Sequence, residues 1–293
     1  MCESLFRDED ETLVQVLQKK ESLKAELNRM KTLKQNRRPQ VSSSATDKPA
    51  VSLVNDLMAT ASVSELEVYK NMRILDLYPL LVRRPVFIEH CKAQLEDVLS
   101  SMSMSKNFEQ EQALHTIAEH FYTRNNEQLL MYVSGVGGTG KSHLINDTVR
   151  FFSQCGFSSF LLLGAPTGIA AVLINGWTVH ALCYLAVKDT KSKDDELRAI
   201  WKDVRYLIID EVSMLSARTL CEISERLCQA KSWDATAPKK PFGGVNIIFM
   251  GDFGQLKPIR KKSLYDGELV DALKHTKYTA EVHQDLRGVI LWS

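Results

Sequence analysis

A glycine-rich run followed at once by lysine and serine restricts the fold of this chain more than any other feature. The run GVGGTGKS occupies residues 135–142 and fits the phosphate-loop pattern GxxxxGK[ST]. Glycines let backbone N–H groups turn inward around phosphates, and a helix that begins there points the positive end of its dipole at them. We therefore expect a nucleotide to be held by Gly135, Val136, Gly137, Gly138, Thr139, Gly140, Lys141 and Ser142.

Short apolar runs around this loop predict the rest of a sheet. The strand candidates, which alternate with helical stretches, are residues 129–134, 160–163, 205–210 and 245–250. Continuous apolar strands separated by helices are typical of a parallel sheet covered on both faces. The predicted fold class is therefore α/β, with a helix that starts at Lys141 directly after the glycine-rich loop.

Composition divides the chain into four parts. Residues 1–36 carry a helical stripe of apolar side chains, which predicts either a single solvated helix or a short coiled coil. Residues 37–50 are rich in Ser, Pro and basic residues and predict a flexible linker, whereas residues 51–105 return to helical patterns. The α/β domain is expected over residues 106–293, with a charged surface loop at residues 188–197.

Overall composition excludes some classes of protein. The chain of 293 residues has 44% hydrophobic and 25% charged residues, as soluble globular proteins do, and no apolar run reaches membrane length. The formal net charge is only +1, so a nucleic-acid site would have to be local. The six cysteines show no metal-binding spacing, and the acidic residues 1–10 lack a signal or transit layout. These features predict a soluble intracellular protein with reduced thiols.

The third predicted strand ends in a pair of acidic residues, Asp210 and Glu211. A carboxylate delivered to the sheet edge beside the loop can hold Mg²⁺ together with the hydroxyl of Ser142, so Asp210 and Ser142 are the candidate metal ligands. Glu211 is the candidate general base that polarises the attacking water. Lys141 would reach the β- and γ-phosphates. ATP and Mg²⁺ are therefore the expected ligands.

A neutral side chain follows the fourth predicted strand. Gln255 lies in the segment GDFGQLKP, for which a plain turn is the alternative interpretation because Gly-Asp favours turns. An amide both donates and accepts hydrogen bonds, so Gln255 is suited to sense the γ-phosphate and to couple it to a bound strand. Gln255 joins Lys141 and Glu211 as a catalytic candidate.

Two segments after the second predicted strand are candidates for gripping DNA, and they read APTGIAA and GWTVH. Thr167, Gly168 and Thr178 supply small donors and open backbone that suit a phosphodiester. Trp177 or His180 could stack on a base. A purely structural histidine is the alternative interpretation of His180.

Taken in order, these motifs resemble the Pif (petite integration frequency) family of superfamily-1 DNA helicases, and above all the helicase modules of Helitron-type transposons. The resemblance covers residues 107–258. It implies a RecA-like fold and 5′-to-3′ unwinding of single-stranded or forked DNA, driven by ATP with Mg²⁺. It also implies a role in DNA repair, recombination or telomere maintenance, in the nucleus or, as the alternative, in the mitochondrion.

The resemblance assigns one further residue. The segment FEQEQ at residues 108–112 is similar to the N-terminal glutamine motif of the family, in which Gln112 would read the adenine edge. The family usually shows Leu-Asn-x-Glu-Gln there, so Phe108 and Glu109 depart from the pattern. The departure concerns adenine recognition and leaves phosphate binding untouched.

Family members continue into a second RecA-like domain, whose arginine completes the ATP site. Residues 259–293 are too few for such a domain, and they predict only a helix at residues 268–275 and an irregular end at residues 291–293. Such an arginine is worth about 10³ to 10⁵ in rate, so we expect slow ATP hydrolysis without unwinding by this chain alone. Two alternatives stay open: a nucleotide-switch ATPase that serves as a scaffold, and an inactive transposon-derived fragment.

Overall fold

A computed structural model describes the part of the chain that contains the predicted motifs. The described residues all belong to one of two compact units, Ser43–Ser293. They are residues 78, 81–82, 84–101, 107–123, 127–185, 191–232, 240–272 and 280–292. The helix or coiled coil predicted for residues 1–36, the linker at residues 37–50 and most of the helical stretch before residue 84 therefore lie outside the described residues.

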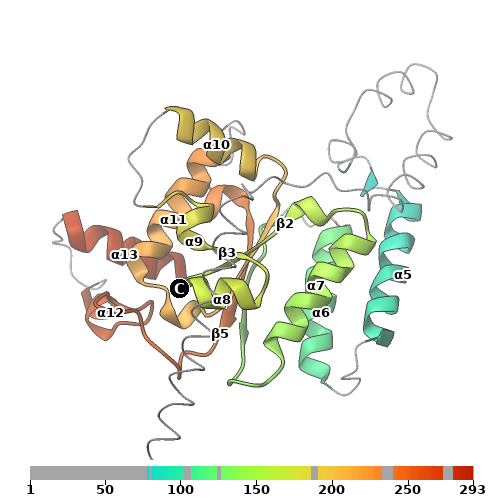
Figure 1. The fold of residues 1–293 in the computed structure, drawn as a ribbon, viewed down its shortest axis with the longest axis horizontal. Helices are drawn as coiled ribbons and strands as arrows, with labels where there is room; N and C mark the ends of the chain where they lie inside the picture. Colours follow the sequence, from blue (N-terminus) through green and yellow to red (C-terminus); the bar gives the residue numbers. More distant parts are fainter. Residues whose placement is uncertain are drawn as a thin grey trace, which may run out of the picture. The chain divides into compact units, whose positions relative to one another are not determined.

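A five-stranded parallel sheet forms the centre of the domain (Figure 1), and its strands lie in the spatial order β1-β5-β4-β2-β3. The strands are, in chain order, Leu130–Ser134, Leu161–Ala165, Trp177–Thr178, Tyr206–Ile209 and Asn246–Gly251. The predicted α/β class and the four predicted strands are confirmed. The strand β3 was not predicted, because its two residues are too few to produce an apolar run.

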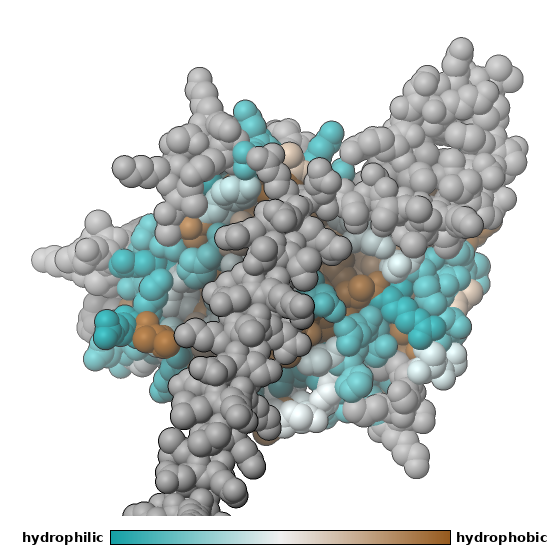
Figure 2. Space-filling model, in the orientation of Figure 1, coloured by the Kyte–Doolittle hydropathy of each residue, from teal (hydrophilic) through white to brown (hydrophobic). Residues whose placement is uncertain are grey.

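Helices cover the two faces of the sheet and create two hydrophobic clusters. Alternate residues of a strand point to opposite faces, so Ile208 enters the first cluster whereas Leu207 and Ile209 enter the second. The first face is covered by α6 (Phe108–Thr123) and α7 (Lys141–Gln154), and α5 (Pro85–Ser101) packs against these two helices on the side away from the sheet (Figure 1). The side of this region that Figure 2 shows is mostly hydrophilic. The second face is covered by α9 (Val179–Leu182), α10 (Lys191–Trp201), α11 (Ala217–Ala230) and α13 (Ala280–Trp292).

Shorter helices occupy the connections between these elements. They are α8 (Gly168–Leu173), α12 (Gly267–Ala272) and the 3-10 turns Ser158–Phe160, Val212–Met214 and Pro241–Gly244. Among the described helices, none is long and apolar enough to cross a membrane. The described cysteines all carry free thiols, and they are Cys91, Cys155, Cys183, Cys221 and Cys228.

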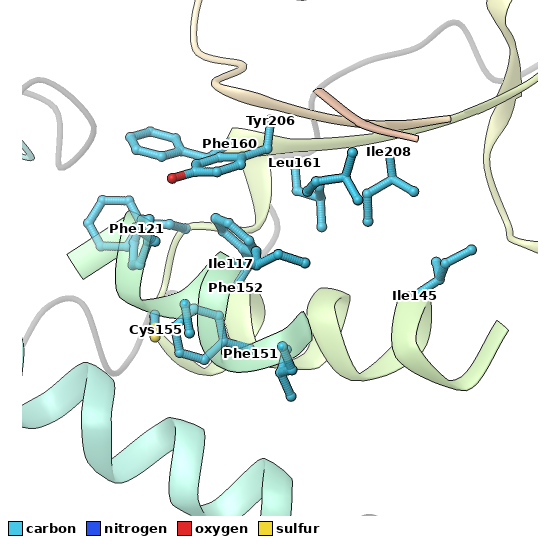
Figure 3. Packing of buried hydrophobic residues seen from close by; sticks show 14 of the residues in the cluster. Ile117, Phe121, Ile145, Phe151, Phe152, Cys155, Phe160, Leu161, Tyr206 and Ile208 are labelled. Carbon is cyan, nitrogen blue, oxygen red and sulfur yellow. The ribbon is translucent and has the colours of Figure 1, made fainter. Parts of the chain in front are cut away.

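The first cluster is built around aromatic rings (Figure 3). Phe121 of α6 lies 5.0 Å, centroid to centroid, from Phe152 of α7, and Phe152 lies 5.0 Å from Tyr206 of β4. Phe87 of α5 packs 5.8 Å from Phe121, so α5 shares this core with the α/β domain. The domain boundary predicted at residues 105/106 therefore does not coincide with a break in the hydrophobic core.

The charged run at residues 188–197 was wrongly predicted as a loop, because α10 begins at Lys191. The segment is an amphipathic helix, in which Leu197 and Trp201 are fully buried. The charged residues that precede them made the segment look like a surface loop. The Trp201 indole N–H donates to the carbonyl oxygen of Leu182 at 2.9 Å, and Asp194 pairs with Arg226 on α11 at 3.3 Å. These contacts come from distant parts of the chain, so local composition could not reveal them.

The C-terminal prediction was also wrong. In place of an irregular end at residues 291–293, α13 runs to Trp292. The helix predicted at residues 268–275 is present as α12, and residues 273–275 of that prediction lie outside the described residues. The helix α13 packs on α11 through Leu286 and Val289, which are buried. Its register depends on Gly288, since a Cβ atom there would lie 1.8 Å from the carbonyl oxygen of Ala217.

We predict that Gly288→Ala destabilises the protein, even though alanine favours a helix over glycine by about 1 kcal/mol. The overlap with Ala217 forces α13 away from α11, and such overpacking typically costs about 1–3 kcal/mol. Urea or thermal unfolding measures the change. Gly267→Ala is the matched control, because a Cβ atom there meets nothing within 4 Å. Unchanged or increased stability of Gly288→Ala would contradict the close helix contact.

Candidate functional site

The carboxyl ends of the five strands share one edge of the sheet, because all the strands run parallel. Every predicted motif except the glutamine segment on α6 follows one of these strands, and ligands of open α/β sheets bind at such an edge. The order along the edge is the glycine-rich loop after β1, Gln255 after β5, the acidic pair after β4, Thr167 after β2 and His180 after β3. With neighbouring strands about 4.8 Å apart, the edge extends roughly 19 Å from β1 to β3.

The loop after β1 owes its shape to glycine. Gly138 and Gly140 have φ values of 84° and 86°, which side chains rarely adopt. A Cβ atom at Gly135 would lie 2.5 Å from the Thr139 hydroxyl, which itself donates to the carbonyl oxygen of Val136 at 2.8 Å. The loop therefore closes on itself at these positions in a way that only glycine permits.

Lys141 and Ser142 are the first two residues of α7, which begins after Gly140. The Lys141 ammonium donates to the carbonyl oxygens of Gly135 and Val136, the second at 3.2 Å. These bonds hold the positive charge over the loop. Ser142 is exposed, so its hydroxyl is accessible to a ligand bound there.

Asp210 and Glu211 follow β4 through an unusual backbone. Glu211 adopts the left-handed conformation with φ 53°, a region in which glycine is the usual residue. The Glu211 N–H donates to Asp210 Oδ1 at 2.9 Å, and the Asp210 N–H donates to the carbonyl oxygen of Gly164 at 2.9 Å. The turn follows β4 at once, so both acidic residues stand at the carboxyl end of that strand.

Burial is the main influence on the titration of both carboxyls. It raises the pKa of Asp210, while the hydrogen bond from Glu211 and the charge of Lys141 lower it in part. Burial also raises the pKa of Glu211, with further increases from the charges of Asp210 and Asp252, and Lys141 opposes them. The influence of Lys141 on both carboxyls indicates that the acidic pair lies beside the glycine-rich loop.

Gln255 reaches the same loop from β5. A Cβ atom built at Gly137 would lie 3.2 Å from Gln255 Nε2, so the amide sits against the loop. The Gln255 N–H donates to the carbonyl oxygen of Asp252 at 3.0 Å, and the Gly254 N–H donates to Asp252 Oδ1 at 2.8 Å. The segment is therefore a turn, and the turn brings Gln255 to the loop.

A different glutamine from the one expected touches the loop from α6. Gln110 is only 7% exposed, and its Nε2 donates to the carbonyl oxygen of Thr139 at 2.6 Å. Its Oε1 is buried without a partner among the described residues. Gln112 lies two residues on, is exposed, and faces another side of the helix. Its assignment to the adenine edge stays a prediction.

The sequence did contain a signal for Gln110. Its spacing of three, four and seven residues to Ala113, Leu114 and Ile117 places it on the buried stripe of α6. A polar residue on such a stripe needs a hydrogen-bond partner, and the glycine-rich loop supplies one here.

The segments expected to grip DNA follow β2 and β3. Thr167 caps α8 and Thr178 caps α9, because their hydroxyl oxygens accept the N–H groups of Ala170 at 3.3 Å and Ala181 at 3.2 Å. A hydroxyl that accepts in this way keeps its own O–H to donate to a phosphate. Gly168 has open space around it.

His180 is exposed at the end of the sheet edge. Partial burial lowers the pKa of its imidazole, and the nearby positive charge of Lys261 lowers that pKa further. Trp177 is partly buried against the second hydrophobic cluster. Of the two aromatic candidates for base stacking, His180 is therefore the more accessible.

Mg²⁺ fits the residues beside the loop. Among the described residues, no three His, Cys, Asp or Glu side chains gather closely enough to enclose a metal. Mg²⁺ commonly takes one or two carboxylates together with substrate phosphates and water. Asp210 and the Ser142 hydroxyl match that donor set, whereas a structural metal cage would need more ligands.

Comparison with known proteins shows to which family the chain belongs. Residues 105–285 match the family model described as PIF1-like helicase, which is more than half of the chain. The chain belongs to the PIF1-like helicase family. The predicted resemblance to the Pif family is confirmed, and the parallel sheet with its glycine-rich loop is the RecA-like domain of this family. The likeness to Helitron-type modules stays a prediction.

Curated relatives of this PIF1-like chain are much longer than the part it matches. It is 33% identical over 141 residues to the ATP-dependent DNA helicase RRM3 of Saccharomyces cerevisiae, covering 45% of this chain and 19% of that protein. It is also 33% identical over 140 residues to the ATP-dependent DNA helicase PIF1 of Mus musculus, covering 45% of this chain and 20% of that protein. The chain thus spans about a fifth of these relatives.

Among solved structures, the PIF1-like chain is similar to a Pif1 helicase from Bacteroides in complex with ADP-AlF3 and single-stranded DNA. The sequence identity is 28%, the TM-score is 0.42, and the match covers 57% of this chain and 36% of that one. It is also similar to the Pif1 helicase from Candida albicans, with 22% identity, a TM-score of 0.44 and coverage of 61% and 46%.

We predict that Gln110→Ala weakens nucleotide binding about two- to tenfold, because one net hydrogen bond contributes roughly 0.5–1.5 kcal/mol. The bond holds the phosphate loop at Thr139, so the loss should be equal for ATP and GTP. Titration calorimetry measures both affinities. Gln112→Ala, on the same helix but exposed, is the control and should change only the ratio of ATP to GTP affinity. A loss confined to ATP in Gln110→Ala would contradict the role in holding the loop.

We predict that, as the pH is lowered, kcat/KM for ATP begins to fall at a higher pH than it would if the general base had the pKa of an ordinary glutamate. A general base works only when deprotonated, and the raised pKa of Glu211 keeps the proton on it to a higher pH. Asp252→Asn removes a neighbouring negative charge but keeps Oδ1 for Gly254, so its acid limb should move to lower pH. The ionisation of ATP itself is the same for the wild-type protein and the variant, so it does not contribute to a difference between them. If the acid limb of the Asp252→Asn profile does not shift, the charge of Asp252 does not raise the pKa of the general base.

Proposed function

We propose that this chain is the nucleotide-binding part of an ATP-dependent DNA helicase. The observation that carries the proposal is the meeting of three groups from three neighbouring strands. Lys141 follows β1, Gln255 follows β5, and Asp210 with Glu211 follows β4, while Thr167 and His180 continue the same edge. A nucleotide and a DNA strand can therefore bind side by side on one rigid edge.

The residues divide the work of hydrolysis between them. The backbone of the glycine-rich loop and Lys141 bind and orient the phosphates. Glu211 accepts a proton from the attacking water. Ser142 and Asp210 would hold Mg²⁺, which would supply neutralisation of charge on the transferring phosphoryl group. Gln255 lies against the loop and can respond to the presence of the γ-phosphate.

Unwinding itself requires more than this domain. Translocation needs a second domain that opens and closes on the nucleotide, and it needs an arginine that completes the site. We infer that the described domain contributes nucleotide binding, slow hydrolysis and part of the DNA grip. Movement in the 5′-to-3′ direction on single-stranded or forked DNA, in repair, recombination or telomere maintenance, belongs to the complete motor. The nucleus, with the mitochondrion as the alternative, is its proposed compartment.

The decisive experiment is ATP hydrolysis by the 293-residue chain with Mg²⁺, with and without single-stranded DNA. We expect slow turnover that DNA stimulates, because both ligands share one edge of the sheet. Lys141→Ala should abolish ATP binding, and Glu211→Gln should keep binding while turnover falls by at least about 100-fold, as for loss of a general base. Binding by filter retention and phosphate release are the two measurements.

Each outcome separates the proposal from its alternatives. Turnover that DNA does not change would favour a nucleotide-switch ATPase, and absence of ATP binding would favour an inactive fragment. Retained binding in Lys141→Ala would refute the assignment of the phosphate loop. Unchanged turnover in Glu211→Gln would refute the general base.

A further inference from the structure

We propose that the basic segment at residues 257–262 is a second contact site for the backbone of single-stranded DNA, continuing the grip of His180. The inference rests on the proposed helicase function and extends it to cations that have been assigned no role above. The segment reads KPIRKK, in a chain whose formal net charge is only +1. A local concentration of positive charge on a neutral protein is the electrostatic sign of a nucleic-acid site.

Three of the four cations in this segment are available to a ligand. Lys262 is neutralised, because its ammonium lies 2.6 Å from a Glu268 carboxylate oxygen and 3.9 Å from one of Asp266. Lys257, Arg260 and Lys261 are exposed, and none of them pairs with a carboxylate among the residues that the structure describes. An unpaired surface cation can release the counterions of a phosphate without first breaking an ion pair.

The segment is fixed in place, so its charges are presented at defined positions. The Ala217 N–H donates to the carbonyl oxygen of Lys262 at 3.1 Å, and Ser263 forms an antiparallel bridge with Ser216 at the start of α11. The Lys261 ammonium lies 3.4 Å from the Thr219 hydroxyl on the same helix. A ligand that binds here therefore meets a site with little backbone freedom to lose.

The segment lies near two parts of the functional edge. It begins two residues after Gln255, whose amide lies against Gly137 of the phosphate loop. Toward its other end, Lys261 contacts Thr219 in the first turn of α11, and the charge of Lys261 also lowers the pKa of His180. A strand held by His180 would therefore have the cations of the segment close by.

An aromatic ring accompanies the cations. Tyr265 is 36% exposed, and the ammonium of Lys257 lies 5.5 Å from its ring centroid. The ring is held by Phe253 at a centroid distance of 4.9 Å, and its hydroxyl donates to the Phe253 carbonyl oxygen at 3.3 Å. Proteins that bind single strands combine such rings with backbone cations, because any base can stack on them.

The test compares two triple variants of the full chain. The first is Lys257→Gln, Arg260→Gln and Lys261→Gln, which removes charge but keeps polar side chains of similar length. The control is Arg84→Gln, Lys202→Gln and Lys240→Gln, which removes the same charge from exposed positions. Lys202 and Lys240 precede β4 and β5, so they lie at the opposite, amino edge of the sheet.

Fluorescence anisotropy with labelled oligo-dT gives the affinity at several salt concentrations, and thermal unfolding verifies that each variant is folded. Each lost phosphate contact should reduce the salt slope by about 0.7, so three contacts reduce it by roughly two. Between 50 and 200 mM salt, the wild-type protein should therefore lose about 20-fold more affinity than the segment variant. The control variant should keep the wild-type slope.

The outcomes distinguish this inference from the proposed function. If the wild-type chain binds oligo-dT and the segment variant keeps the full salt slope, the segment is not a DNA contact, although the helicase assignment stands. If both triple variants lose slope equally, the effect is one of net charge and the inference is overturned. If the wild-type chain binds RNA but no DNA, or neither, the helicase proposal fails and the inference fails with it.

Discussion

The fold depends on a parallel sheet that is buried on both faces. Every residue of β4, Tyr206–Ile209, is buried, and successive side chains feed opposite hydrophobic clusters. Such a strand has no exposed face on which a functional group could sit, so polar chemistry is confined to the strand ends. Because the strands are parallel, their carboxyl ends collect at one edge. The placement of Lys141, Glu211 and His180 follows from this confinement.

The strand β5 has a particular role in that arrangement. It lies between β1 and β4, so the two strands that lead into the phosphate loop and the acidic pair are not adjacent in the sheet. The end of β5, where the Asp252 turn holds Gln255, therefore stands between the ends of those two strands. The same strand end leads into the basic segment at residues 257–262. A change in the position of Gln255 would therefore be transmitted along one continuous stretch of backbone.

The sequence allowed prediction of those features whose cause is local. Glycine in the loop of residues 135–140 and the four apolar strands could be read from consecutive residues, and the family resemblance followed from them. The strand order, the hydrogen bond from Gln110 to Thr139 and the helix α13 could not be predicted in that way, because each depends on contacts between residues far apart in the chain. The helix α10 was missed for a local reason, because the charged residues at its start outweighed the buried Leu197, Ile200 and Trp201.

The left-handed backbone at Glu211 affects which substitutions this position accepts in evolution. A residue other than glycine in the left-handed region costs about 1–2 kcal/mol, so folding alone would tolerate, and even reward, the loss of this side chain. Stability therefore offers no reason to retain a glutamate there, and only the chemistry of its carboxylate does. In a lineage released from ATP hydrolysis, position 211 should be among the first in the domain to change, well before the aromatic core around Phe121.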